Sequence, residues 1–227
     1  MDLDGKSVLE HCYDNAQKSK LKTAVYILTD NDIVYKHCLG FTTNVILTNP
    51  NHESGTARII EAISLDMFKN TKNIINLQGD EPFISNILID KMFSSLIDGN
   101  KIVSCYHAIP EKEALTSNNV KVVLDKNNNA MYFSRSIIPF IRDKEKGSTY
   151  LYNQHIGLYG YSFKTLSELN NLKLSDLEAK EKLEQLTFLY EGFSINMIKT
   201  NEKPIGIDTQ SDYEKALQYI IQSKKEQ

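Results

Sequence analysis

Apolar and polar positions in the first half of the chain alternate between two periods. Short apolar runs typical of buried strands lie at residues 23–28, 43–47, 73–77 and 101–109. Segments with the spacing of amphipathic helices separate them, at residues 6–17, 30–39, 54–68 and 86–97. In the third of these, the face expected to pack on the sheet carries Ile59, Ile60, Ile63 and Met67. Short strands that alternate with helices of this length predict βαβ units and a mostly parallel sheet flanked by helices.

The second half of the chain has a different pattern. Residues 120–124 and 130–133 flank an Asn-rich segment, which predicts a β-hairpin because Asn tolerates the left-handed turn conformation. Residues 142–150 are rich in charge and predict a surface loop. The other expected elements are a long strand at 152–163, a helix at 175–188, a strand at 194–200 and a terminal helix at 210–224. At 227 residues, the chain suits a single α/β domain.

Charge and cysteine content narrow the class of protein. With 26 Lys and Arg against 29 Asp and Glu, the formal net charge is −3, without the basic excess of proteins that bind nucleic-acid polymers. Cys12, Cys38 and Cys105 form no CxxC pair, so we expect no disulfides and a cytoplasmic protein. The first residues lack a signal-peptide pattern, and no apolar run approaches about 18 residues, so we expect no membrane span.

The segment Gln78-Gly79-Asp80-Glu81-Pro82 directly follows the apolar run 73–77. Ligands of open α/β sheets bind at the carboxyl ends of strands, and a carboxylate there can hold Mg²⁺ against phosphate oxygens. Gly79 would allow a ligand close to the backbone. The alternative is a plain strand-to-helix turn with Asp80 as a polar turn residue, and the pattern alone leaves both interpretations open.

A second acid, Asp208, lies between an expected strand and the last helix. Its ordinary role would be to cap that helix. Two strand-end carboxylates, Asp80 and Asp208, could also hold one Mg²⁺ together, although the pattern does not determine whether they meet.

The segment His52-Glu53-Ser54-Gly55-Thr56-Ala57-Arg58 opens an expected helix. Backbone N–H groups and the positive dipole at such a start favour an anion or a base edge, and Arg58 adds a permanent charge. The alternative is an ordinary Ser or Thr cap. Arginine is rare in this chain, occurring only at Arg58, Arg135 and Arg142. Because lysine serves the surface, we expect Arg135 to bind a carboxylate and Arg142 to be solvated.

The segment 155–161 alternates so that its polar side chains share one face of a strand. That face would carry His155, Gly157, Tyr159 and Tyr161. A bare glycine between polar rings suits a sugar lying on the sheet, whereas a half-buried structural histidine is the alternative. Glu184 and Gln185 lie in an expected helix, where such residues are usually exposed. The five histidines show no metal-ligand spacing, so we expect no zinc site.

Taken in order, these segments resemble the 3-deoxy-manno-octulosonate (KDO) cytidylyltransferases, or CMP-KDO synthetases. The resemblance covers nearly the whole chain, and its motifs are HESGTAR at 52–58, QGDEP at 78–82, VKVVLD at 120–125, YFSR at 132–135, HIGLYGY at 155–161, LEQL at 183–186 and GIDT at 206–209. All three arginines fall where the family pattern also has arginine. Seven motifs in register make the match specific.

The resemblance implies a nucleotide-diphospho-sugar-transferase-like fold, with a nucleotide side in residues 1–110 and a sugar and dimerisation side in residues 111–227. It implies a homodimer that converts CTP and KDO to CMP-KDO and pyrophosphate with Mg²⁺, for lipopolysaccharide biosynthesis. Asp80 and Asp208 would hold the metal and form the catalytic group with Arg135. The residues implied about the nucleotide are Ser54, Gly55, Arg58 and Gln78. Those implied about the sugar are Arg135, His155, Tyr159, Glu184 and Gln185.

The family pattern differs from this chain at the N-terminus. The family begins with a strand and a basic loop that cradles the CTP triphosphate, and this chain begins after them. We therefore expect either a start assigned too late or a truncated form with unpaired strand edges. Two alternatives to a KDO enzyme stay open: a cytidylyltransferase for a related acid sugar such as 8-amino-KDO, and a weak or inactive nucleotide-binding homologue.

Overall fold

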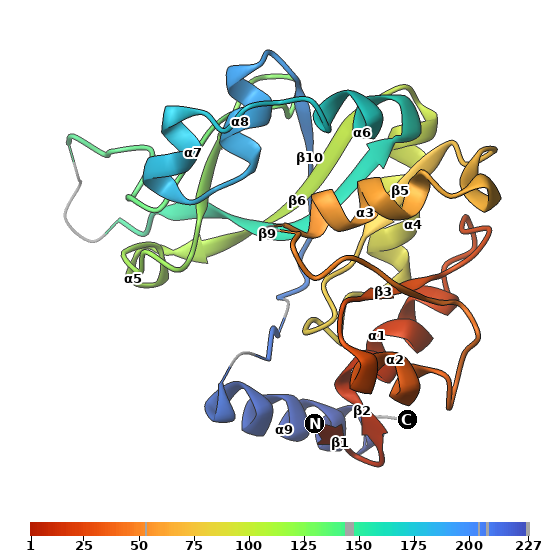
Figure 1. The fold of residues 1–227 in the computed structure, drawn as a ribbon. Coiled ribbons are helices and arrows are strands. Elements are labelled where there is room, and N and C mark those ends of the chain that lie inside the picture. The colour runs from red at the N-terminus through yellow and green to blue at the C-terminus, as the bar shows by residue number, and fades with distance from the viewer. Residues whose placement is uncertain (53, 144–147, 204, 208, 226–227) are drawn as a thin grey trace. The chain divides into compact units, whose positions relative to one another are not determined.

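The computed structural model describes residues 1–52, 54–143, 148–203, 205–207 and 209–225 (Figure 1). The chain forms two compact units. Unit 1 comprises Met1–Thr71, Asn76–Phe93 and Pro204–Gln227, and unit 2 comprises Lys72–Ile75 and Ser94–Lys203. Each unit contains its own candidate site residues, so each is described by itself.

Unit 1 is built from short strands and the helices that follow them. Its elements are β1 (Asp2–Leu3), β2 (Lys6–Ser7), α1 (Val8–Gln17), β3 (Ile27–Thr29), α2 (Asp32–Cys38), β4 (Val45–Leu47), α3 (Gly55–Ile63), a 3₁₀ turn η1 (Asp66–Phe68) and α9 (Gln210–Lys225). Helix α4 (Asn86–Ile97) begins in this unit and ends in unit 2. The parallel pair β3–β4 confirms the βαβ unit expected from the first half of the chain.

Two apolar clusters hold unit 1 together. Ile27, Cys38 and Val45 join the parallel strands to α2. Leu3 packs with Ala216 and Ile220 of α9, so the two ends of the chain share one core. Burying such side chains contributes roughly 1.5–3 kcal/mol each.

Unit 2 contains a six-stranded mixed sheet. Its elements are β5 (Asn73–Asn76), β6 (Ile102–Pro110), α5 (Glu111–Ala114), β7 (Lys121–Leu124), β8 (Ala130–Ser134), β9 (Leu151–Ser162), α6 (Phe163–Leu169), α7 (Asp176–Glu181), α8 (Gln185–Tyr190) and β10 (Ile195–Lys199). The strand order is β10-β6-β9-β7-β8, with β5 also paired to β9. Strands β6 and β10 run parallel, whereas β9 is antiparallel to β6 and β7. The α/β fold class with a mixed sheet is confirmed.

The predicted hairpin is present and shows how its sequence specifies it. Strands β7 and β8 are antiparallel. The Asp125 carboxylate accepts the backbone N–H groups of Asn127 and Asn129 at 2.8 and 2.7 Å. Asn128 takes the left-handed conformation with φ 61°. Asn and Asp are the residues that favour this turn.

Strand β9 is closely packed at one position and irregular at another. A Cβ at Gly160 would lie 2.6 Å from Val103 and 2.7 Å from Ile75, so only glycine fits between those side chains. The pairing of β6 with β9 shifts register between Ser104 and Cys105, where Tyr159 and Ile156 are the partners. Gly157 lies in this bulge and departs from the simple alternation that the sequence predicted.

Two local predictions were wrong. The expected helix 175–188 is two helices, α7 and α8, drawn separately in Figure 1, because Lys182 adopts a left-handed conformation with φ 55°. The expected helix 54–68 ends at Ile63, so Met67 does not join the buried face and is 59% exposed. The predicted loop 142–150 includes residues 144–147, which lie outside the described residues, and Arg142 is exposed as expected.

Candidate active site

In unit 1, the start of α3 lies beside the segment that follows β5. A Cβ added to Gly55 would be 3.4 Å from the Asn76 amide nitrogen and 3.9 Å from that of Gln78. Two of the motifs recognised in the sequence therefore meet, although Gln78 is 23 positions from Gly55. Glycine keeps this place open between two amide side chains, which can donate hydrogen bonds to a base or a phosphate.

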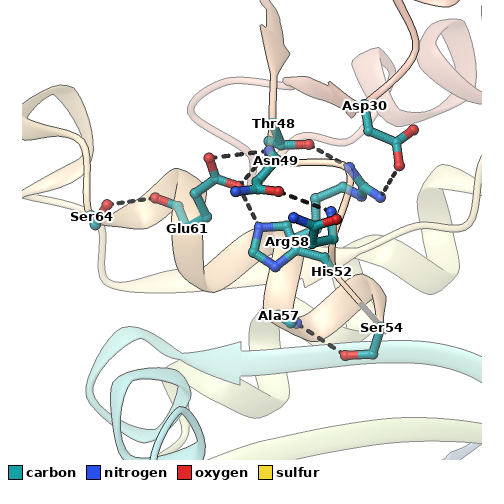
Figure 2. A network of polar contacts seen from close by, with 10 residues as sticks. Asp30, Thr48, Asn49, His52, Ser54, Ala57, Arg58, Glu61 and Ser64 are labelled. Carbon is teal, nitrogen blue, oxygen red and sulfur yellow. Dashed lines mark hydrogen bonds and ion pairs between the residues drawn. The ribbon is translucent and has the colours of Figure 1, made fainter.

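Ser54 is the N-cap of α3. Its backbone is extended and its hydroxyl accepts the N–H of Ala57 at 3.1 Å, a contact drawn in Figure 2. The ordinary capping role weighed for this serine is therefore present. The cap fixes the helix start, and its positive dipole end lies next to Gly55.

Arg58 bridges the two parallel strands of unit 1. Its guanidinium donates to the Asp30 carboxylate at 2.8 Å and to the Thr48 hydroxyl (Figure 2). Asp30 follows β3, and Thr48 follows β4. The hydrogen bond from Arg58 lowers the pKa of Asp30. Within this unit, Arg58 ties the two strand ends to α3.

The same helix carries a second polar contact. His52 and Glu61 are hydrogen-bonded, and the Glu61 carboxylate accepts the N–H of Asn49 at 2.9 Å (Figure 2). These bonds, that from Asn49 first, lower the pKa of Glu61. Thr48, Asn49 and His52 are thus each bonded to a side chain of α3.

Asp80 lies in unit 1, in the segment that follows β5. The segment that leads into α9 contacts it. The Asp80 carbonyl accepts the N–H of Ile207 at 3.0 Å. Ile207 directly precedes Asp208, which lies outside the described residues. The QGDEP and GIDT motifs are therefore neighbours in unit 1, a proximity that sequence reasoning left open.

Helix α1 closes the other side of the QGDEP segment. The Cys12 thiol donates to the Gly79 carbonyl at 3.3 Å, and the place of a Gly79 Cβ is 3.2 Å from Leu9. Burial, and next the charges of Asp80 and Glu81, raises the pKa of Cys12 to about 12. The charges of the two carboxylates therefore act on the thiol of α1.

The described residues contain no cluster of three or more His, Cys, Asp or Glu side chains that could hold a metal by themselves. Mg²⁺ is usually held by one or two carboxylates together with phosphate oxygens and water. Asp80 beside the segment leading to Asp208 fits that donor set.

In unit 2, His155 is buried on a face made of aromatic rings. Its Nε2 is 2.9 Å from the Ser104 hydroxyl, and its ring centroid is 4.9 Å from that of Phe133 and 5.4 Å from that of Tyr159. Tyr159 in turn stacks on Tyr161 at 6.0 Å. The shared face predicted for the three polar rings is confirmed. Burial lowers the pKa of His155 to about 3, so the imidazole is neutral.

Tyr159 has a buried hydroxyl for which the described residues offer no hydrogen-bond partner. Its side chain is only 8% exposed. Burial first, then Tyr161 and the charge of Glu184, raises its pKa well above the ordinary value. An unpaired buried hydroxyl costs roughly 1–3 kcal/mol, which a bound polar group would remove.

Glu184 and Gln185 form the start of α8, not the middle of one long helix. Glu184 is the N-cap residue and is half-buried. Gln185 is 4% exposed, so the usual exposed role weighed for it is wrong. Both follow shortly after the left-handed Lys182 that separates α7 from α8, with Leu183 between.

Arg135 follows β8 and reaches the same turn. Its Nε donates to the Glu181 carbonyl at 2.7 Å. Its terminal nitrogens make longer contacts, at 3.2 Å to the Ser117 carbonyl and 3.4 Å to that of Lys182. The guanidinium is fixed at Nε, while Nη1 and Nη2 lie on its more exposed side.

Sequence reasoning gave no role to several residues that shape these two sites. In unit 1 the missed residue is Asp30, and in unit 2 they are Ser104, Lys121 and Glu181. Lys121 and Ser104 carried a signal, because each is a polar residue inside an apolar strand run. Glu181 carried none, since it lies inside the expected helix 175–188, where a glutamate is usually exposed.

Comparisons with known proteins identify the class first. A solved 4-diphosphocytidyl-2C-methyl-D-erythritol synthase from Anaerococcus prevotii matches 97% of this chain with a TM-score of 0.63 at 17% identity, which shows a shared fold. A structure of CMP:2-keto-3-deoxy-manno-octonic acid synthetase complexed with CTP matches 98% of this chain and 91% of that one, with a TM-score of 0.90 and 32% identity. The fold is that of the nucleotidyltransferases.

The family follows from sequence. A family model described as cytidylyltransferase matches residues 1–202. A 3-deoxy-manno-octulosonate cytidylyltransferase from Fusobacterium nucleatum is 36% identical over 96% of this chain and 88% of its own length. One from Helicobacter pylori (strain HPAG1) is 40% identical over 95% of this chain and 88% of its own length. The chain therefore belongs to the cytidylyltransferase family, and the resemblance and the assignment to nucleotidyltransferase enzymes are confirmed.

Two further observations concern membrane-spanning helices and the state of the cysteines. Among the described residues, no helix is long and apolar enough to cross a membrane. All three cysteines are free and buried.

Proposed function

We propose that this chain transfers the cytidylyl group of CTP to KDO, forming CMP-KDO and pyrophosphate. The observation that carries the proposal is its similarity, over about 95% of the chain, to relatives named for this reaction. The similar synthetase structure contains CTP. The two sets of polar residues in units 1 and 2 provide the groups that a nucleotide and an acid sugar require.

On the nucleotide side, we propose that Ser54, Gly55 and Gln78 contact CTP. The capped start of α3 offers a positive dipole end, and the Gln78 amide can hydrogen-bond a base or a phosphate. Arg58 would contribute indirectly, because it holds the ends of β3 and β4 through Asp30 and Thr48.

Mg²⁺ would be held by Asp80 and Asp208. When bound, the metal would orient the phosphates and offset the charge that develops on the leaving pyrophosphate. The support for this assignment is the contact between Ile207 and Asp80, which brings the two motifs together. Phosphoryl-type transfer depends mainly on such positioning and charge neutralisation.

On the sugar side, Arg135 would bind the KDO carboxylate through its terminal nitrogens. The buried Tyr159 hydroxyl and neutral His155 would hydrogen-bond sugar hydroxyls, and Glu184 and Gln185 would hold the rest of the ring. The anomeric hydroxyl of KDO would then attack the α-phosphorus in line with the leaving pyrophosphate. The P–O bond to pyrophosphate breaks as the new one to KDO forms.

The proposed setting is cytoplasmic lipopolysaccharide biosynthesis by a homodimer. Free buried cysteines are compatible with a reducing compartment. Unit 2 exposes large apolar side chains that a second copy could cover: Met131, Phe140 and Leu151.

The test is pyrophosphate release by the purified chain with CTP, KDO and Mg²⁺, and with 8-amino-KDO in place of KDO. We expect release that requires both substrates and Mg²⁺ and that is faster with KDO. Light scattering on the same preparation should give the mass of a dimer.

A version extended upstream of Met1 should be assayed in parallel, because the curated relatives are longer than this chain. Faster release with 8-amino-KDO would reassign the sugar. Folded protein that releases no pyrophosphate in either form would overturn the proposed function and leave a nucleotide-binding homologue.

A further inference from the structure

A lysine is completely buried in the strand that enters the sugar-side hairpin. Lys121 is 0% exposed, and its neighbour Val122 is 1% exposed. Burying an ammonium group is costly unless hydrogen bonds and an opposite charge compensate for it. An apolar side chain would be the simpler choice in such a strand, so the contacts of Lys121 call for a specific explanation.

The ammonium group of Lys121 bonds to the backbone carbonyls of two loop residues. Its Nζ donates to the Arg135 carbonyl at 2.6 Å and to the Thr116 carbonyl at 3.2 Å. The charge of Glu181 acts in the opposite direction to burial and raises the pKa of Lys121, although burial is the larger effect and the net shift is downward. Carbonyl acceptors and a nearby carboxylate thus compensate for the buried charge.

Glu181 also binds Arg135, the residue whose carbonyl accepts from Lys121. Its carboxylate accepts the Arg135 backbone N–H at 2.8 Å and the Ser134 hydroxyl at 2.7 Å. Its carbonyl accepts the Arg135 Nε at 2.7 Å. The backbone N–H, the backbone carbonyl and the side chain of Arg135 are therefore all fixed by two charged residues.

These contacts also fix the turn that begins α8. Glu181 is the last residue of α7, and the left-handed Lys182 follows it. Glu184 and Gln185 come after one further residue, Leu183. Whatever holds Glu181 against Arg135 therefore also sets the position of these two residues.

We propose that Lys121 and Glu181 form a clamp that positions Arg135 and the start of α8 for binding of the acid sugar. Neither residue needs to touch the sugar, so both are positioning residues. The longer contacts of Nη1 and Nη2 use one N–H each, which leaves an N–H on each nitrogen for a bidentate contact with a carboxylate. The inference rests on the proposed function for the identity of the sugar, but the clamp itself does not.

The kinetic test uses Lys121→Met, which keeps an unbranched stem and removes the ammonium. Lys126→Met is the matched control, since Lys126 is exposed in the turn of the same hairpin. We expect Lys121→Met to raise the KM for KDO about tenfold, while kcat and the KM for CTP stay within about twofold. The control should match the wild type. Equal rises in both KM values, or none, would overturn the clamp.

Glu181→Gln is the second variant, because it keeps the shape of the side chain and removes only its charge. We expect the same selective rise in the KM for KDO, and a double variant whose effect is smaller than the product of the two single effects. If Lys121→Met does not fold, Glu181→Gln decides the matter, and a normal KM for KDO would overturn the proposal.

Amide hydrogen exchange separates this inference from the proposed function. Peptides covering 133–137 and 181–186 should exchange about tenfold faster in Glu181→Gln than in the wild type, with unit 1 unchanged. If the wild type does not turn over KDO, the proposed function fails, whereas faster exchange still supports the clamp. Unchanged exchange in both peptides overturns the clamp whatever the enzyme activity.

Discussion

The candidate site in unit 1 and that in unit 2 are built in opposite ways. In unit 1, the polar groups follow short strands or begin a helix, and Gln78, Gly79 and Asp80 are exposed or half-buried. In unit 2, His155, Tyr159 and Gln185 are each more than nine-tenths buried among aromatic rings and apolar side chains. The candidate site in unit 1 is formed by residues at strand and helix ends, and that in unit 2 lies on the face of a sheet.

This difference suits the two kinds of ligand. A triphosphate with its metal brings charge that requires exposed backbone and carboxylates, and it keeps much of its water. A sugar is held by many directional hydrogen bonds, which are stronger when the partners are buried and already oriented. We therefore expect substitutions in unit 1 to affect charge neutralisation, and those in unit 2 to affect orientation and stability.

The largest expected effect tests the charge side of this comparison. Asp80→Asn should lower kcat about 10²–10³-fold, because a neutral amide cannot hold Mg²⁺ as a carboxylate does. The measurement is pyrophosphate release over a range of Mg²⁺ concentrations, with thermal unfolding to verify the fold. Asp98→Asn, at an exposed position after α4, is the control. A decrease of less than about threefold would show that Asp80 does not neutralise charge in the reaction.

An intermediate effect tests the buried side. His155 has a pKa of about 3 in the folded chain against an ordinary value of 6.5. Below pH 6.5, the unfolded chain takes up a proton that the folded chain does not, so this residue makes stability fall as the pH falls towards 3. Above pH 6.5 this loss is absent.

His155→Gln should remove that dependence. Between pH 7 and pH 5 the free energy of unfolding should fall by about 2 kcal/mol less than in the wild type. Urea unfolding at the two pH values measures it, with exposed His37→Gln as the control. An unchanged difference between the two pH values would mean that His155 is not buried as a neutral ring.

The smallest effect sharpens the comparison by using the same substitution in both units. Ser54 caps α3 and Ser162 caps α6, each with its hydroxyl accepting a backbone N–H. Replacing either by alanine should lower stability by about 1 kcal/mol. Only Ser54→Ala should also raise the KM for CTP, by a few fold, since Ser54 and not Ser162 is proposed to contact CTP. Similar KM values for both variants would contradict this assignment.

Much of the fold could be predicted from local patterns. The hairpin was readable because Asp125 and Asn128 determine its turn within a few residues. The HESGTAR and QGDEP motifs were readable because each is contiguous and lies between an apolar run and an expected helix. The contact between Asp80 and Ile207 could not be predicted from local patterns. It depends on how α9 packs against the N-terminal residue Leu3.

The parts that were missed depend on contacts between distant segments. The left-handed Lys182 that separates α7 from α8 comes directly after Glu181, which contacts Ser134 and Arg135, 47 and 46 positions away. Helical spacing alone favours one continuous helix there. Likewise, the bulge beside Gly157 is a property of the pairing of β9 with β6, and alternation within one strand does not reveal it.

Cys12 offers a natural indicator of motion in unit 1. A thiol reacts as its thiolate, and a pKa of about 12 leaves almost none of that form at neutral pH. Its Sγ is also bonded to the Gly79 carbonyl, within the segment that carries Asp80. Labelling by a thiol reagent would therefore require α1 to separate from this segment. The rate at which Cys12 is modified thus measures how often the acidic segment opens, without any added probe.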